Sequence, residues 1–172
     1  FTDANVKVGS GAADALTTGV NNTAVGKDAL TASTTGSSHV AVGMQALKSN
    51  TTGGSNSALG YSALEMNTTG SDNVAVGQKA LEENTTGDYN TAVGAYALDD
   101  ATTSDNNTAV GYNALTANTT GASNTAVGAL ALDAVTTASS CSALGKSCLT
   151  SVTTGASNTG VGDNTGNGIT TN

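Results

Sequence analysis

The sequence predicts an all-β protein, a parallel β-solenoid (β-roll or β-helix) of ten 17-residue turns, and its strongest sign is a constant period. The run Ala-Val-Gly, or Ala-Leu-Gly in its place, returns every 17 residues or a multiple of 17, at residues 24–26, 41–43, 58–60, 75–77, 92–94, 109–111, 126–128 and 143–145. Related triplets stand at either end, at residues 7–9 and 160–162. A short period without insertions is typical of coils whose turns stack on one another. We therefore expect one repeat domain over residues 1–172, a segment of a longer fibre, with turns that start at residues 5, 22, 39, 56, 73, 90, 107, 124, 141 and 158.

The composition is the second observation. Leu, Ile, Val and Phe make up 28 of 172 residues, and the net charge is -8, a combination that is usual in disordered chains. The strict period argues against disorder, because a solenoid needs only one or two large apolar residues per turn. Two adjacent threonines, glycine and asparagine in each repeat exclude an uninterrupted helix.

We number the repeat so that Asn22 is position 1 and Ser38 is position 17, and we call residues that share a position a column. Positions 1–4 read Asn-Thr-Ala-Val, which favours a short strand, and the invariant glycine at position 5 predicts a tight bend with positive φ. Ala-Leu at positions 8–9 predicts a second short strand or a turn with leucine pointing inward. Thr-Thr-Gly at positions 13–15 predicts a third extended stretch and a second bend.

Strand alternation then predicts which residues face inward. The larger residue at position 4 is expected inside, with Val25, Val42, Val76, Val93, Val110 and Val127 forming the dry interior together with the position 9 leucines, Leu30, Leu47, Leu64, Leu81, Leu98, Leu115, Leu132 and Leu149. The position 3 alanines, Ala24 to Ala143, would then face outward as a smooth stripe where chains pack together. The alternative is that alanine merely fits a curved wall of the coil.

The column at position 1 is asparagine in eight turns, with His39 and Cys141 in the other two. Stacked asparagines can bond amide to amide along a fibre, so this column predicts a ladder. The simpler alternative is that asparagine only begins a turn.

The motif Asn-Thr-Ala-Val-Gly-x-x-Ala-Leu-x-x-Asn-Thr-Thr-Gly, as in residues 107–121, resembles two kinds of repeat. One belongs to the heads of YadA-like trimeric autotransporter adhesins, whose Ala-Ile-Gly is similar to Ala-Val-Gly here. The other, closer in motif, belongs to phage tail-fibre and tail-fibre-like proteins. The resemblance covers all ten turns and implies a homo-oligomeric, trimeric rod. It lends no catalytic residue to any position.

Catalytic, metal and cofactor sites find little support in the sequence. His39 is the one histidine and stands in the asparagine column, so we expect a ladder substitute and no enzyme. The pairs Glu82-Glu83 and Asp99-Asp100 lie at variable corners, where a solvated surface is expected and calcium between stacked corners is the alternative. No metal and no cofactor is expected. Five lysines against thirteen acids argue against nucleic acid, and no apolar run predicts membrane insertion.

Three smaller features have two readings each. Cys141 and Cys148 form a disulfide across the coil or stay as buried thiols. Four tyrosines at corners stack on sugars or are ordinary surface residues: Tyr61, Tyr89, Tyr96 and Tyr112. Asparagines that begin Asn-Thr-Thr fit the N-glycosylation pattern but follow from the repeat alone: Asn50, Asn67, Asn84 and Asn118.

The function that the sequence favours is a structural fibre or adhesin segment, a viral tail fibre or a cell-surface or secreted filament, located outside the cell. Its expected partners are further copies of itself and a cell-surface glycan or receptor. The alternative is an ice-binding solenoid that uses the Thr-Thr columns at positions 13 and 14. Because these threonines are adjacent, only one of the two columns is expected to face out squarely.

Overall fold

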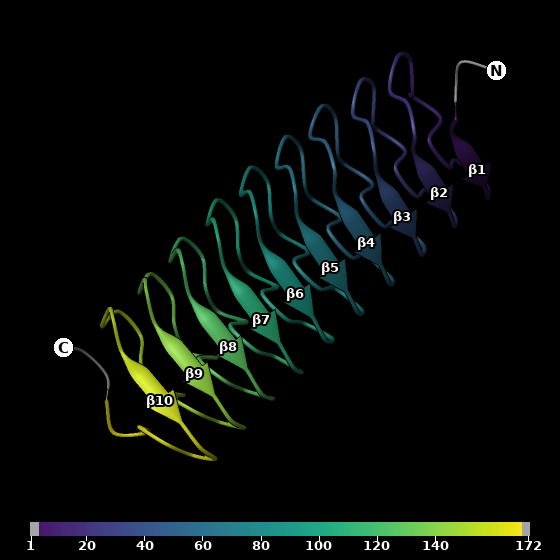
Figure 1. Cartoon of the computed structure of the whole chain (residues 1–172). Coiled ribbons are helices and arrows are strands. Elements are labelled where there is room, and N and C mark those ends of the chain that lie inside the picture. Colours follow the sequence, from purple (N-terminus) through teal and green to yellow (C-terminus); the bar gives the residue numbers. More distant parts are fainter. Residues whose placement is uncertain (1–3, 170–172) are drawn as a thin grey trace.

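The computed structural model describes residues 4–169 and consists of ten short parallel strands stacked into one sheet (Figure 1). The strands are β1 (Val6–Val8), β2 (Thr23–Val25), β3 (Val40–Val42), β4 (Ser57–Leu59), β5 (Val74–Val76), β6 (Thr91–Val93), β7 (Thr108–Val110), β8 (Thr125–Val127), β9 (Ser142–Leu144) and β10 (Thr159–Val161). They lie in the order of the sequence, from β1 at one end of the rod to β10 at the other. The predicted β-solenoid is confirmed.

Each residue of a strand pairs with the residue 17 places further on. Ala92 pairs with Ala109, and Val93 pairs with Val110. The same register holds between all neighbouring strands, so every column of the sequence is a column in space, and the repeats are its turns. At the strand spacing of about 4.8 Å, nine such steps give a rod of about 45 Å.

The rest of each turn is built from turns and bends: positions 8–9 form the turn that was the alternative to a second strand, and the predicted third extended stretch does not become a strand. Leu98 and its equivalents at position 9 have positive φ, 56° for Leu98, which interrupts an extended backbone. The bends still stack by hydrogen bonds between turns, such as Leu98 N–H to the Ala114 carbonyl at 3.0 Å and Thr85 N–H to the Thr102 carbonyl at 2.8 Å. A left-handed leucine costs about 1–2 kcal/mol, and complete burial of its side chain contributes about 1.5–3 kcal/mol, so the arrangement is sustained.

The predicted interior is right for leucine and wrong for valine. The position 9 leucines are fully buried, as expected. The position 3 alanines, from Ala24 to Ala143, are also buried, with Ala92 at 0% exposure, whereas the position 4 residues face outward and Leu59 is 50% exposed. Ala24 to Ala143 are therefore not a stripe between chains, and the alternative, a wall of the coil, is the one observed.

The physical reason is space. Position 3 lies against the alanine or cysteine of position 8 and the leucine of position 9, which already fill the narrow interior. At Gly160, a position 3 residue, an added Cβ would lie 2.7 Å from Cys148 Sγ and 2.9 Å from Leu149 Cγ. Such an interior has no room for a column of valine, because added volume forces side chains and backbone to move.

The glycine at position 5 ends each strand with positive φ, as predicted. Gly94 has a φ of +136°, and an added Cβ would lie 2.5 Å from the Gly111 carbonyl oxygen in the next turn. Every larger residue would therefore be excluded twice, by its own backbone conformation and by the turn stacked on it.

The predicted asparagine ladder exists at position 1, but most of its hydrogen bonds run from side chain to backbone and not from amide to amide. Asn73 Oδ1 accepts the backbone N–H of Asn90 in the next turn at 2.9 Å, and Asn73 Nδ2 donates to the Gly87 carbonyl of its own turn at 2.8 Å. The side chain thus bonds to backbone at both ends. In this way it satisfies buried peptide groups that no strand partner reaches.

One amide-to-amide bond of the expected kind occurs at position 1, from Asn107 Nδ2 to Asn90 Oδ1 at 3.2 Å, and further ones occur at position 12. Asn67 Nδ2 donates to Asn50 Oδ1 at 2.9 Å, and Asn84 Nδ2 donates to Asn67 Oδ1 at 2.8 Å. Asn118 belongs to the same column but stands between Ala101 and Val135, and its buried Oδ1 has no hydrogen-bond partner.

This difference gives a matched pair of substitutions. We expect Asn67→Val to lower the free energy of unfolding by about 1–3 kcal/mol, because it leaves Asn50 Oδ1 buried without its donor. We expect Asn118→Val to be neutral or stabilising by up to about 1 kcal/mol, because it removes an unpartnered oxygen, while the Gly121 carbonyl keeps its bond from Asn107. Denaturant unfolding of both variants is the measurement, and equal losses would contradict the ladder.

Candidate interaction face

The outward side chains of the strands form one continuous face. We call it the outer face and define it by the residues of positions 2 and 4, which project to the same side because strand side chains alternate. Position 2 holds Val, Thr or Ser, and position 4 holds Val or Leu, in every turn. The face therefore contains no charged residue, although the net charge of the chain is -8.

The outer face is large for a surface exposed to water. Its length of about 45 Å and its width of about 10 Å, for three residues of each strand, give a flat area of about 450 Å². Val40 is 44% exposed and Leu144 is 54% exposed. Position 4 is aliphatic in every turn, and position 2 is Thr or Ser in seven of the ten turns and Val in the others. The area is comparable to the largest apolar patch of a typical monomeric protein, about 300–600 Å², and such patches are often functional.

The outer face is hollowed near its C-terminal end. A groove of about 250 Å³ lies over β8, β9 and β10 and is lined by Thr125, Val127, Ser142, Ala143, Leu144, Thr159, Gly160 and Val161. These are residues of positions 2, 3 and 4 alone. The groove therefore belongs to the outer face and is not a separate site.

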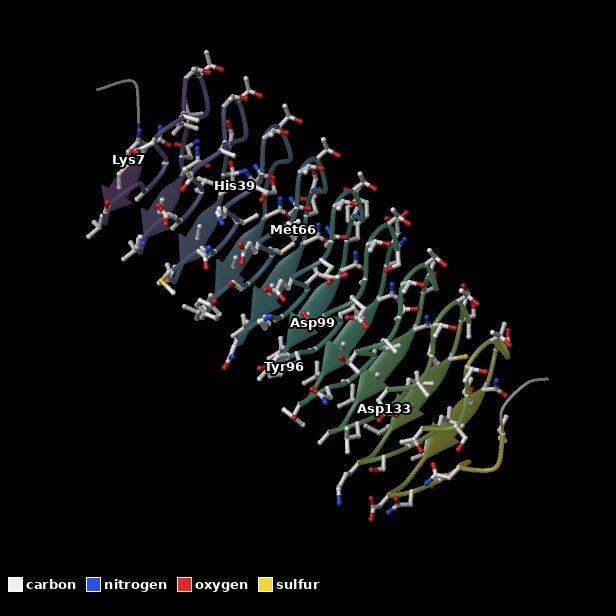
Figure 2. The ribbon with its side chains drawn as sticks, turned by 180° about the vertical axis from the view of Figure 1, so that it is seen from behind. Lys7, His39, Met66, Tyr96, Asp99 and Asp133 are labelled. Atoms are coloured by element: carbon white, nitrogen blue, oxygen red, sulfur yellow. The ribbon has the colours of Figure 1, made fainter. Side chains whose placement is uncertain are left out.

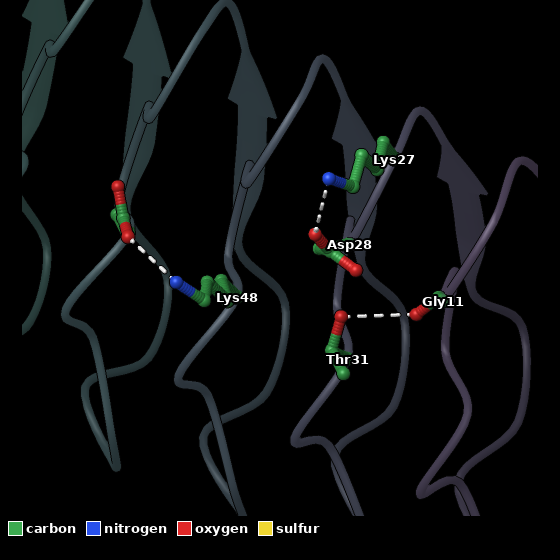
Figure 3. Close-up of polar contacts among 6 residues, drawn as sticks. Gly11, Lys27, Asp28, Thr31 and Lys48 are labelled. Carbon is green, nitrogen blue, oxygen red and sulfur yellow. Dashed lines mark hydrogen bonds and ion pairs between the residues drawn. The ribbon is translucent and has the colours of Figure 1, made fainter.

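Charged side chains lie at the corners of the coil, as the sequence predicts. Lys48 Nζ lies 3.2 Å from Glu65 Oε1 in the next turn, and Lys27 Nζ lies 3.9 Å from the neighbouring Asp28 (Figure 3). Figure 3 also shows Thr31, whose hydroxyl donates to the Gly11 carbonyl at 2.9 Å. The Lys48–Glu65 and Thr31–Gly11 contacts cross from one turn to the next, whereas Lys27 and Asp28 lie in the same turn.

The acidic pairs meet at one place along the rod. Burial, with a smaller contribution from Glu82, raises the pKa of Asp99 to about 7, and Asp99 Oδ1 is buried without a partner. Beside it a groove of about 460 Å³ is lined by Glu65, Met66, Glu82, Glu83, Thr85 and Thr102. No group of three or more His, Cys, Asp or Glu residues that could hold a metal ion occurs within residues 4–169.

His39 lies inside the coil and takes the place of a ladder asparagine (Figure 2). Its Nδ1 accepts the backbone N–H of Asn56 at 3.2 Å, as an asparagine Oδ1 does elsewhere. Its Nε2 lies 3.1 Å from Asn50 Nδ2, and the ring also has a hydrogen bond with the backbone of Gly53, the position 15 residue that the position 1 amide contacts in other turns. Because Nδ1 is an acceptor, the ring is neutral, and burial lowers the pKa of His39.

The remaining candidates gather into no site. Cys141 and Cys148 are both buried and free, so the thiol reading is the observed one and the disulfide is absent. Tyr96 and Tyr112 pack edge to face at a corner with ring centroids 6.3 Å apart, and Tyr61 and Tyr89 are exposed. The Asn-Thr-Thr asparagines are wholly buried and hydrogen-bonded, so a folded coil does not present them for glycosylation: Asn50, Asn67, Asn84 and Asn118.

Comparison with protein families, with curated proteins and with solved structures gives no match for this chain. Across the part that the structure describes, no helix is long and apolar enough to cross a membrane. We therefore base the functional proposal below on the outer face. The sequence contains a sign of this face, because in Thr-Ala-Val only the middle residue is small and the two outer residues share one side of the strand. That side was expected inside the coil, whereas it faces outward.

The position of His39 predicts an effect of pH on stability. A histidine with a lowered folded pKa binds fewer protons when folded, so stability is fully present above the ordinary value of 6.5 and falls as the pH drops below it. The loss approaches about 1.4 kcal/mol per pH unit until the folded pKa is reached. We expect His39→Asn, which copies the other turns, to remove this loss.

Unfolding free energies of the two proteins between pH 7 and 5 provide the measurement. Protonation of Asp99, whose raised pKa favours folding as the pH falls from about 7, contributes equally to both and cancels in the difference. Parallel pH profiles would show that His39 is not buried as a neutral acceptor.

Proposed function

We propose that this chain is a rod segment of a homo-oligomeric fibre in which copies pack through the outer face. The observation that carries the proposal is that this face is uncharged and has valine or leucine at position 4 in all ten strands, in a chain whose charges all lie elsewhere. Packing two or more copies there would bury surface that a thin coil exposes to water. The role is structural and non-enzymatic.

Three copies suit the shape of the coil. Each chain presents one flat face, and three such faces around an axis parallel to the rod close a prism with the valines and leucines inside. The resemblance to trimeric adhesin heads and tail-fibre repeats supports the same number. It also supports a location outside the cell, in a virion tail fibre or a surface or secreted filament, with a cell-surface glycan or receptor as the further partner.

A single substitution separates assembly from folding. We expect Val93→Asp, in the middle of the outer face, to weaken association at least about 100-fold, because each copy would bury an unpaired carboxylate. The matched control Val93→Thr keeps the shape and copies a residue type already present on this face, so it should assemble like the natural chain. Sedimentation equilibrium is the measurement, with circular dichroism to verify the fold.

Two outcomes would overturn the proposal. One is a natural chain that sediments as a well-folded monomer at all concentrations. The other is a Val93→Asp variant that assembles as the natural chain does. Ala92→Leu serves as the opposite control, since this buried neighbour should disrupt the coil itself.

Ice binding is the second candidate, and one observation favours it. The outer face presents two outward columns separated by an inward residue, and position 2 is threonine in the three consecutive strands β6, β7 and β8. The Thr-Thr columns proposed first are less suitable. Position 13 hydroxyls bond to carbonyls of the next turn, as Thr85 Oγ1 does to Thr102 at 2.9 Å, which leaves position 14 as the exposed column.

A thermal hysteresis assay decides between the two functions. We expect none from the natural chain, because in an assembly the outer face is covered. Hysteresis that is present in the natural chain and lost in Val93→Asp would replace the fibre by ice binding at this same face. Hysteresis unaffected by Val93→Asp would instead direct attention to position 14.

A further inference from the structure

Two turns of the outer face depart from the others, and they do so in the same way. Eight of the ten turns carry a β-branched residue at both position 2 and position 4. In β4 and β9, serine occupies position 2 and leucine occupies position 4: Ser57 with Leu59, and Ser142 with Leu144. A change at either position is accompanied by a change at the other.

The two changes compensate in volume. Serine has one carbon fewer than threonine, and leucine has one carbon more than valine, so the sum over the two positions is unchanged. The leucines stand out from the face, with Leu59 at 50% and Leu144 at 54% exposure. Ser142 and Leu144 line the groove of about 250 Å³ together with residues of β8 and β10, so one of the two Ser-Leu strands lies at a hollow of the outer face.

Rotation of one copy about an axis parallel to the rod brings unlike columns together. Position 4 of one copy then lies beside position 2 of the next, whether two or three copies close the ring. If the rotation carries no shift along the axis, Leu59 meets the partner's Ser57, and the summed volume is the same in every layer. A shift of one turn would set Leu59 against the partner's Val40 or Val74 and leave Ser57 facing a hollow.

We propose, on the basis of the fibre function above, that Leu59 and Leu144 fill the hollows over the partner's Ser57 and Ser142 and thereby fix the register of a closed, parallel assembly. The remaining turns cannot set this register, because threonine and valine have nearly the same shape. They allow the copies to slide by whole turns at little cost. Mismatched volume at two layers makes such slips unfavourable, since overpacking and voids each destabilise a packed interface.

Disulfide trapping between copies tests the register. The background variant carries Cys141→Asn and Cys148→Ala, which copy the residues of most other turns. Chains with Ser57→Cys and chains with Leu59→Cys, one of them enlarged by a tag, are co-expressed, allowed to assemble and mildly oxidised. We expect a cross-link between chains of different size, formed at least about 10-fold faster than in an offset control that combines Ser57→Cys with Val76→Cys.

The outcomes separate this inference from the function on which it rests. If the natural chain and the background variant sediment as monomers, the fibre proposal and the register fall together. If they assemble but the offset pair, or Ser57→Cys with itself, cross-links as fast as the same-turn pair, the assembly stands and the register is overturned.

A volume exchange provides a second measurement on the assembled protein. Ser142→Val alone should weaken association about 10-fold or more by filling the hollow, and adding Leu144→Val should restore it, because the strand then matches β3 and β5. A double variant that associates as weakly as the single one would contradict the pairing of serine with leucine.

Discussion

Across residues 4–169 the strands stack on their equivalents 17 residues away, and this constraint governs the rest of the structure. At a spacing of about 4.8 Å, each side chain contacts the side chains at the same position in the turns before and after it, so a column must be made of residues that pack or bond with one another. Alanine, leucine, threonine and glycine do so by shape, and asparagine does so by carrying a donor and an acceptor on one amide. Like charges do so poorly, and Lys48 is accordingly followed by Glu65. Where the acids Glu82 and Asp99 do stack, burial, with a smaller contribution from Glu82, raises the pKa of Asp99 to about 7.

The same constraint explains how much the sequence predicts. Period, parallel register and the bend at glycine follow directly from the repeat, because stacking turns any sequence period into a spatial one. Which face of the strand is buried does not follow, since that depends on what the remainder of the turn contributes. Leu98 and Ala97 already fill the interior, so the small Ala92 fits beside them and the larger Val93 is turned outward. A prediction based only on the sizes of the strand residues could not take Ala97 and Leu98 into account.

The asparagines give a second example of this limit. Asparagine at position 1 and at position 12 are equally regular in sequence, and a ladder is a reasonable expectation for both. Position 1 lies at the start of a strand, where peptide groups need partners, so Asn73 bonds to backbone in the next turn. At position 12 the buried amides of successive turns stack directly along the rod, and Asn84 Nδ2 donates to Asn67 Oδ1. The backbone between the two positions includes left-handed residues at positions 7 and 9. Asp28 and Asn113 at position 7 are residue types that favour this conformation, but leucine at position 9 rarely adopts it, so the sequence predicts the course of the bend only in part.

If every turn had the same sequence, all turns would be equivalent, and nothing would distinguish one level of the rod from another. The turns differ only at residues that depart from the consensus of the repeat. Some departures keep the role of the residue they replace, as His39 does when Nδ1 takes over from an amide oxygen. Others leave a polar atom without its partner, as at Asn118. The Ser-Leu strands β4 and β9 differ from both, because they alter the outer face while the buried Ala58 and Ala143 between them stay the same. A change confined to the outward side of two strands does nothing for the packing inside the coil, and its consequences therefore fall on whatever meets the outer face.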